Sequence, residues 1–137
     1  MMTVEQRMTR DAITLTPDQS LRDAIGLMQR HRIRHVPVVT GQAVVGILTD
    51  RDLKRATPSL LSGIDRASFD RVLDQTLVEQ AMTRNPFTVT PSTSVRDAVK
   101  VMVDRKFGAL PVVEGGRLVG IVTSTDFLRA FYETLED

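Results

Sequence analysis

The 137-residue sequence contains no cysteine, no excess of one charge and no long apolar run. Without cysteine, disulfides, thiolate metal sites and cysteine nucleophiles are excluded, which fits a reducing compartment. The 18 basic and 17 acidic side chains give a formal net charge of +1, so no overall field attracts nucleic acid or an anionic membrane. No apolar run approaches the roughly 18 to 20 residues that span a bilayer, and residues 1–11 hold no apolar signal core. We expect a soluble cytoplasmic protein that binds neither nucleic acid nor membranes.

Catalytic motifs are missing as well. The chain has no Ser-His-Asp order, no His-Glu metal motif and no glycine-rich phosphate loop of the Walker or Rossmann type. Its Gly115-Gly116 pair is better explained as a hairpin turn. Because no general base or metal cluster is evident, the sequence predicts a protein that is not an enzyme.

What the sequence does contain is an internal repeat. A shift of 74 residues places Met8 on Met82, and no gap is needed. From Val4 to Arg55 against Val78 to Arg129, about 24 of 52 aligned positions are identical, far above chance. The longest shared runs are VEQ, MTR, Thr-Pro, Arg-Asp-Ala, Pro-Val-Val and Val-Gly-Ile.

Each repeat predicts the same order of elements, β-α-β-β-α. Short extended pieces end at Thr-Pro, helical patterns follow a serine, a hairpin comes next, and a last helix follows a threonine. In the first repeat these are 13–15, the pattern after Ser20, the hairpin 36–39 with 43–48, and the helix after Thr49. In the second they are 87–89, the pattern after Ser94, the hairpin 110–113 with 117–122, and the helix after Thr123.

These elements predict an α/β (α+β) protein made of two repeats, 1–57 and 78–137. A three-stranded sheet with one face to cover is not stable alone, so we expect the repeats to pack about a pseudo-two-fold axis. The connector 58–77 begins at Pro58, and its apolar spacing predicts one short amphipathic helix around Phe69 and Leu73.

A further motif, Gly-apolar-apolar-Thr-x-x-Asp, occurs as GILTDRD (Gly46 to Asp52) and as GIVTSTD (Gly120 to Asp126). Together with V-x-x-x-M-T and Pro-Val-Val, it resembles the cystathionine-β-synthase (CBS) domain, and two in tandem resemble a Bateman module. The resemblance implies clefts between the repeats that bind AMP, ADP or ATP, or less often S-adenosylmethionine or another adenosyl compound. It also implies dimerisation into a disc-like assembly.

The resemblance further implies that each cleft draws residues from both repeats. In the first cleft, Asp52 and Thr49 would bind the ribose, and the cations of Arg34 and His35 the phosphate. The adenine would rest on Gly108, Ala109, Leu110 and the Met82-Thr83 segment.

In the second cleft the roles reverse, so Asp126 and Thr123 would bind the ribose. The adenine would then meet bulky Arg34 and His35, and the phosphate would find no cation at Gly108 and Ala109. We therefore expect the site at Asp52 to be the stronger one, and the other to take adenosine or a weakly held nucleotide.

Simpler interpretations of these residues stay open. Thr-x-x-Asp is also the spacing of a helix capping box, and Ser20-x-x-Asp23 shows the same pattern with no implied ligand role. What favours binding is Gly46, which precedes the motif at the end of a buried strand, where the backbone must run close to something. Arg30 and His31 fit a solvated helix C-terminus, and a metal site of His31 with His35 is disfavoured because no acidic residue lies between them.

The sequence therefore predicts a regulatory module that binds an adenine nucleotide, forms a homodimer and signals to an unidentified partner in trans, since no output domain accompanies the repeats. The alternatives are a dimeric scaffold without a ligand, or a binder of S-adenosylmethionine or NAD.

Overall fold

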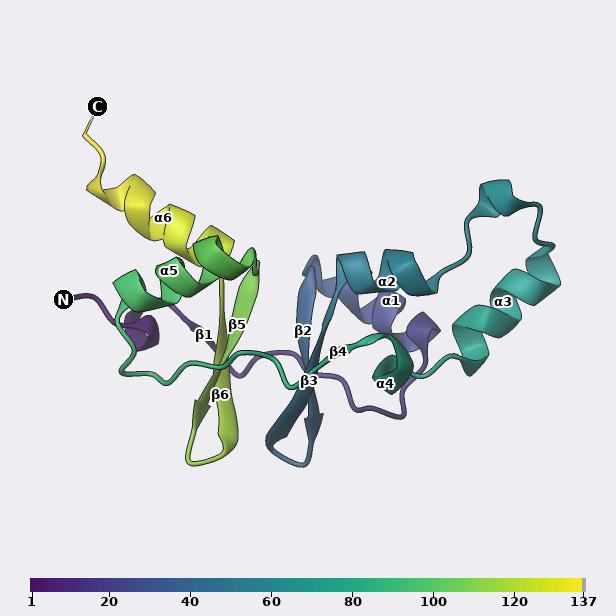
Figure 1. The fold of residues 1–137 in the computed structure, drawn as a ribbon, viewed down its shortest axis with the longest axis horizontal. Helices are drawn as coiled ribbons and strands as arrows, with labels where there is room; N and C mark the ends of the chain where they lie inside the picture. Colours follow the sequence, from purple (N-terminus) through teal and green to yellow (C-terminus); the bar gives the residue numbers. More distant parts are fainter. Residues whose placement is uncertain (137) are drawn as a thin grey trace. The chain divides into compact units, whose positions relative to one another are not determined.

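The computed structural model describes residues 1–136, which form two compact units (Figure 1). Unit 1 consists of Met1–Ala12 and Pro86–Asp137, and unit 2 of Ile13–Asn85. Each unit combines helices with one three-stranded sheet, which confirms the predicted fold class of two repeated α/β modules. The units do not coincide with the sequence repeats, because each unit contains the leading segment of the other repeat.

The predicted hairpins, and the helices predicted on either side of each hairpin, are present in both units. Unit 2 contains α1 (Leu21–His31), β2 (His35–Thr40), β3 (Ala43–Thr49), α2 (Asp50–Ala56), η2 (Leu60–Ser62), α3 (Arg66–Gln75), α4 (Val78–Ala81) and β4 (Thr83–Arg84). Unit 1 contains η1 (Val4–Gln6), β1 (Thr9–Arg10), α5 (Val95–Arg105), β5 (Ala109–Glu114), β6 (Arg117–Thr123) and α6 (Ser124–Thr134). The connector helix predicted around Phe69 and Leu73 is α3.

Local chemistry sets the helix ends. Ser20 and Ser94 accept hydrogen bonds from backbone N–H groups in the first turns of α1 and α5, as the sequence predicts. Both helices end in a left-handed residue, Arg32 or Lys106, whose N–H bonds back into the helix. The longest helices have 11 residues, and within residues 1–136 no helix is long and apolar enough to cross a membrane.

The third strand of each sheet corrects the prediction. The sheets have the orders β2-β3-β4 and β1-β6-β5, so the leading segment of one repeat pairs with the hairpin of the other. The pieces expected to complete the sheets form only isolated parallel bridges, Leu15 to Val38 and Val89 to Val112. Two backbone hydrogen bonds hold Leu15, one to Pro37 and one from Val39, at 3.0 and 2.8 Å.

The exchanged segments also enter the cores. Val78 is fully buried in unit 2 with Leu21 and Leu48, and Val4 is fully buried in unit 1 with Leu110. Burying a valine or leucine side chain stabilises a fold by roughly 1.5–3 kcal/mol. Each unit therefore depends on a segment that belongs to the other sequence repeat.

Candidate functional site

The signature aspartate of unit 2 lies where β3 passes into α2. Thr49 is the N-cap of α2, and its hydroxyl accepts a hydrogen bond from the Asp52 N–H at 3.1 Å. In return, Oδ2 of Asp52 accepts from the Thr49 N–H at 3.0 Å. The capping box considered from the sequence is therefore present.

Burial distinguishes Asp52 from an ordinary cap. Asp23 completes the equivalent capping box of α1, and its side chain is exposed. Asp52 is only 7% exposed and is the one buried charged residue among those described. Within residues 1–136 its Oδ1 has no hydrogen-bond partner, and that oxygen is not sealed from solvent. The carboxylate can therefore cap the helix with one oxygen and accept a ligand hydroxyl with the other.

Two more of the predicted residues lie beside this carboxylate. His35 pairs directly with Thr49 across the β2-β3 ladder, and the Asp50 N–H donates to the Arg34 carbonyl at 3.0 Å. The Arg34 side chain is exposed and forms no ion pair within the described residues. Unit 2 thus brings together four residues predicted for ribose and phosphate: Thr49, Asp52, Arg34 and His35.

The charge of His35 differs from the prediction. Burial lowers the pKa of this imidazole below its usual 6.5, and Arg34 lowers it further, whereas Asp50 and Asp52 oppose the shift. His35 is therefore neutral at pH 7, a hydrogen-bonding group without a fixed charge. Arg34 is the side chain of this group that carries a positive charge at pH 7.

At Gly46, the strand β3 passes close to the backbone of the exchanged strand β4. A Cβ at this position would lie 2.9 Å from the Thr83 carbonyl oxygen and would also collide with the Met82 sulfur. Thr83, in β4, pairs with Ile47 in β3. The glycine is thus required by the exchanged strand, so its presence does not by itself indicate a ligand. Met82 is buried in the core and Thr83 is exposed.

Unit 1 has the same backbone arrangement with different side chains. Oδ2 of Asp126 accepts from the Thr123 N–H at 2.8 Å, and Ala109 pairs with Thr123 as His35 pairs with Thr49. The Ser124 N–H donates to the Gly108 carbonyl at 2.9 Å. Leu110 is fully buried in the core, which leaves its backbone as the part available to a ligand.

Asp126 also has a neighbour that the sequence analysis missed. Arg129 lies 3.8 Å from its Oδ1, a contact that the i,i+3 spacing on α6 could have indicated. In unit 2 the matching residue is Arg55, and no ion pair joins it to Asp52 among the described residues. Both oxygens of Asp126 therefore have a partner.

The remaining expected residues do not join the group around Asp52 within one unit. Gly108, Ala109 and Leu110 belong to unit 1, so their contribution to a site at Asp52 stays a prediction. No group of three or more His, Asp or Glu side chains that could hold a metal lies within residues 1–136.

Sequence comparison matches the family model of the CBS domain twice, at residues 4–59 and 78–133. The chain is 32% identical over 126 residues to the CBS domain-containing protein YhcV of Bacillus subtilis, covering 92% of this chain and 83% of that protein. It is 37% identical over 123 residues to an inosine-5′-monophosphate dehydrogenase of Korarchaeum cryptofilum, covering 89% of this chain but only 23% of the dehydrogenase.

Solved structures show the same fold. The CBS domain pair of protein MJ0100, in complex with 5′-methylthioadenosine and S-adenosyl-L-methionine, superposes with a TM-score of 0.83 at 28% identity, covering 98% of this chain and 99% of that one. CBSX2 of Arabidopsis thaliana, in complex with AMP, superposes with a TM-score of 0.81 at 28% identity, covering 97% and 98%.

Proposed function

Because the chain belongs to the CBS-domain family, we propose that it is a regulatory module that binds an adenine nucleotide at Asp52 and signals to a partner protein in trans. One observation carries the proposal: Asp52 is buried, holds one oxygen free, and lies where α2 begins, next to Thr49 and to the backbone of Arg34, whose side chain is exposed and unpaired within the described residues. A capping residue with no other role would not need that burial, as the exposed Asp23 illustrates.

The arrangement suits a ribose 5′-phosphate. The free oxygen of Asp52 can accept a ribose hydroxyl, and hydrogen bonds to a charged group contribute roughly 1.5–3 kcal/mol each. Arg34 can offset the phosphate charge, and neutral His35 can donate to a phosphate oxygen. If the protein has two conformations, a ligand that binds one of them more tightly raises the population of that conformation, and a partner protein can bind it selectively.

The relatives support an adenosyl ligand without identifying it. CBSX2 is described in complex with AMP, and the MJ0100 pair with two thio-adenosyl compounds. The chain spans 23% of the K. cryptofilum dehydrogenase, and we propose a role without catalysis. An adenine nucleotide is favoured because Arg34 supplies the cation that a phosphate needs.

A ligand screen tests this function. The protein is heated with and without AMP, ATP, NAD and S-adenosylmethionine, and a specific ligand at 100 times its Kd should add about 2.7 kcal/mol to native-state stability. Asp52→Ala should remove the shift. Asp23→Ala is the matched control, because it removes an equivalent capping carboxylate without touching the proposed site.

A second candidate is a dimeric scaffold without a ligand. It is favoured by an exposed apolar stripe formed by Leu128, Phe131 and Tyr132 on α6 and by Leu135 directly after it. The absence of any thermal shift with the four compounds would favour the scaffold and contradict the nucleotide module.

A further inference from the structure

The turn from α1 into β2 carries an unusual concentration of positive charge. Residues 30–35 contain three arginines, two histidines and no acid, a formal charge of +3 with the histidines neutral. Arg30, Arg32 and Arg34 are all exposed, and none forms an ion pair within the described residues. We call residues 30–35 the basic turn.

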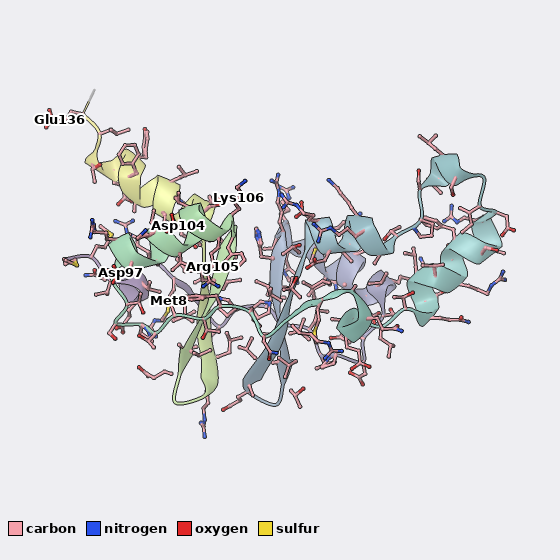
Figure 2. All side chains as sticks on the ribbon, viewed as in Figure 1. Met8, Asp97, Asp104, Arg105, Lys106 and Glu136 are labelled. Carbon is pink, nitrogen blue, oxygen red and sulfur yellow. The ribbon has the colours of Figure 1, made fainter. Side chains whose placement is uncertain are left out.

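The second repeat provides an internal comparison. Residues 104–109, which match the basic turn, contain one aspartate, one arginine and one lysine, a formal charge of +1. Figure 2 shows Asp104, Arg105 and Lys106 at the end of α5. Arg105 lies over the Phe87 ring at 5.1 Å, and Asp104 forms an ion pair with Lys100. In the second repeat Asp104 and Arg105 therefore interact with neighbouring side chains, whereas the arginines of the basic turn form no ion pair within the described residues.

The backbone of the basic turn is fixed, so its side chains leave from defined positions. Arg32 adopts φ 54° and ψ 45°, and the N–H groups of Arg32 and Ile33 both bond to the Met28 carbonyl. The Arg34 carbonyl is held in turn by the Asp50 N–H, next to the proposed ribose site. The three arginines therefore follow one another along a backbone that is anchored, at Arg34, next to the proposed ribose site.

We propose that the basic turn makes the Asp52 site select an adenosine polyphosphate, such as ATP, over AMP. This inference rests on the proposed function. A monophosphate needs one cation, and Arg34 supplies it. Arg32 and Arg30 lie two and four residues further along a fixed turn, where a lengthening phosphate chain would find further guanidinium groups. Guanidinium is the side-chain group best suited to bind phosphate oxygens in pairs.

An acidic protein segment is the other class of anion that this turn could attract. The polyphosphate is favoured because the backbone of the basic turn is anchored next to the proposed ribose site at Asp52, a residue that a protein segment would not need. Binding of an acidic protein would give no dependence on Asp52, so ATP binding that Asp52→Ala weakens would favour the polyphosphate.

The test is calorimetric titration with AMP, ADP, ATP and inorganic tripolyphosphate, at constant ionic strength with EDTA. The wild-type protein should bind ATP at least tenfold more tightly than AMP, with ADP between them. Arg32→Gln, and more strongly Arg30→Gln combined with Arg32→Gln, should reduce the ATP/AMP ratio toward one. Lys106→Gln is the matched control, because Lys106 has the same helix position and a similar left-handed backbone, φ 59° and ψ 40°, in the other unit.

Each result has a clear meaning. Equal affinities for AMP and ATP in the wild-type protein would overturn this inference and leave the proposed function standing. The inference would also fail if Lys106→Gln lowered the ratio as much as Arg32→Gln, or if tripolyphosphate bound as tightly as ATP and independently of Asp52. Failure of every nucleotide to bind would instead overturn the proposed function. Circular dichroism confirms that the surface variants fold.

Discussion

Two aspartates of unit 2, Asp23 and Asp52, cap helices through the same pair of hydrogen bonds. Their sequence patterns are the same, and neither spacing nor residue type separates them. The difference is that the Asp52 side chain is buried beside the paired residues His35 and Thr49, while Asp23 faces solvent. The position of Asp52 in the tertiary structure, which the repeat pattern does not reveal, makes this capping residue a candidate binding residue.

The two signature aspartates should differ in their effect on binding. Asp52→Ala should weaken AMP binding tenfold or more, because it removes a charge-assisted hydrogen bond next to a cation. Asp126→Ala should leave the tighter event nearly intact, since its own unit has Gly108 and Ala109 in place of the cation and its Oδ1 lies near Arg129. Titration calorimetry on both variants measures this. Loss of the tighter event in Asp126→Ala alone would show that the sites are ranked in the wrong order.

His35 should make stability depend on pH in a definite window. Because its pKa is lowered in the folded protein, the unfolded chain binds this proton first as the pH falls below about 6.5. The folded state therefore loses stability between pH 7.5 and 5.5, and solvent screening of the partly exposed ring limits the size of that loss.

Urea midpoints at the two pH values check this dependence on His35. His35→Gln should show a smaller loss of stability than the wild-type protein over the same interval. Carboxylates with lowered pKa values, such as Asp65 and Glu133, lose their contributions only at lower pH, so they do not interfere. An equal loss in both proteins would assign the effect to other groups.

At the scale of elements, the periodicity of each repeat was enough to predict α1, α2, α5, α6, both hairpins and the connector helix α3, but not the short helices η1, η2 and α4. Periodicity is a local signal, and Ser20, Ser94 and the Thr-Pro pairs mark boundaries within the chain. The exchange of β1 and β4 was not predicted, because pairing Thr83 with Ile47 satisfies the same pattern as pairing within one repeat. Gly46 and Gly120 were the available signal, and the sequence did not show which segment approaches them.

The close approach of the exchanged strands can be tested at these glycines. Gly46→Ala and Gly120→Ala should each destabilise the protein by about 1–3 kcal/mol, because the added Cβ would lie 2.9 Å from the Thr83 carbonyl or 2.7 Å from the Thr9 carbonyl. Gly26→Ala is the control: it lies within α1 with nothing within 4 Å of the new Cβ, and should stabilise the protein by roughly 0.5–1 kcal/mol. Denaturant unfolding measures all three, and a neutral Gly46→Ala would argue against the β3-β4 pairing.

For the whole molecule, the exposed apolar stripe at α6 is a candidate contact for the homodimer expected from the sequence. Leu128, Phe131 and Tyr132 recur at the i, i+3, i+4 spacing of one helix face, Leu135 follows directly after the helix in an extended conformation, and each is more than half exposed. The matching positions of the first repeat are Lys54, Thr57, Pro58 and Leu61, which make no such stripe. We therefore expect α6 to contribute more than α2 to the proposed homodimer.

This expectation has a direct measurement. Light scattering at micromolar concentration should give the mass of a dimer for the wild-type protein, and Leu128→Glu with Phe131→Glu should shift it toward the monomer. Lys54→Glu, at the position equivalent to Leu128, is the control and should leave the mass unchanged. A monomeric wild-type protein, or a double variant that stays dimeric, would contradict a dimer through α6.

Because of the exchange of segments, the two units can complete their sheets at different times during synthesis. Unit 2 is one continuous stretch, Ile13–Asn85, and can close as soon as β4 has left the ribosome. Unit 1 has its first strand at Thr9–Arg10 and the partner strand at Arg117–Thr123. At roughly 5–20 residues per second, that first strand waits on the order of 5 to 20 seconds for its partner. We expect Val4 and Met8, which pack in the core of unit 1 once it folds, to remain without their partners during that interval, while unit 2 can already be folded.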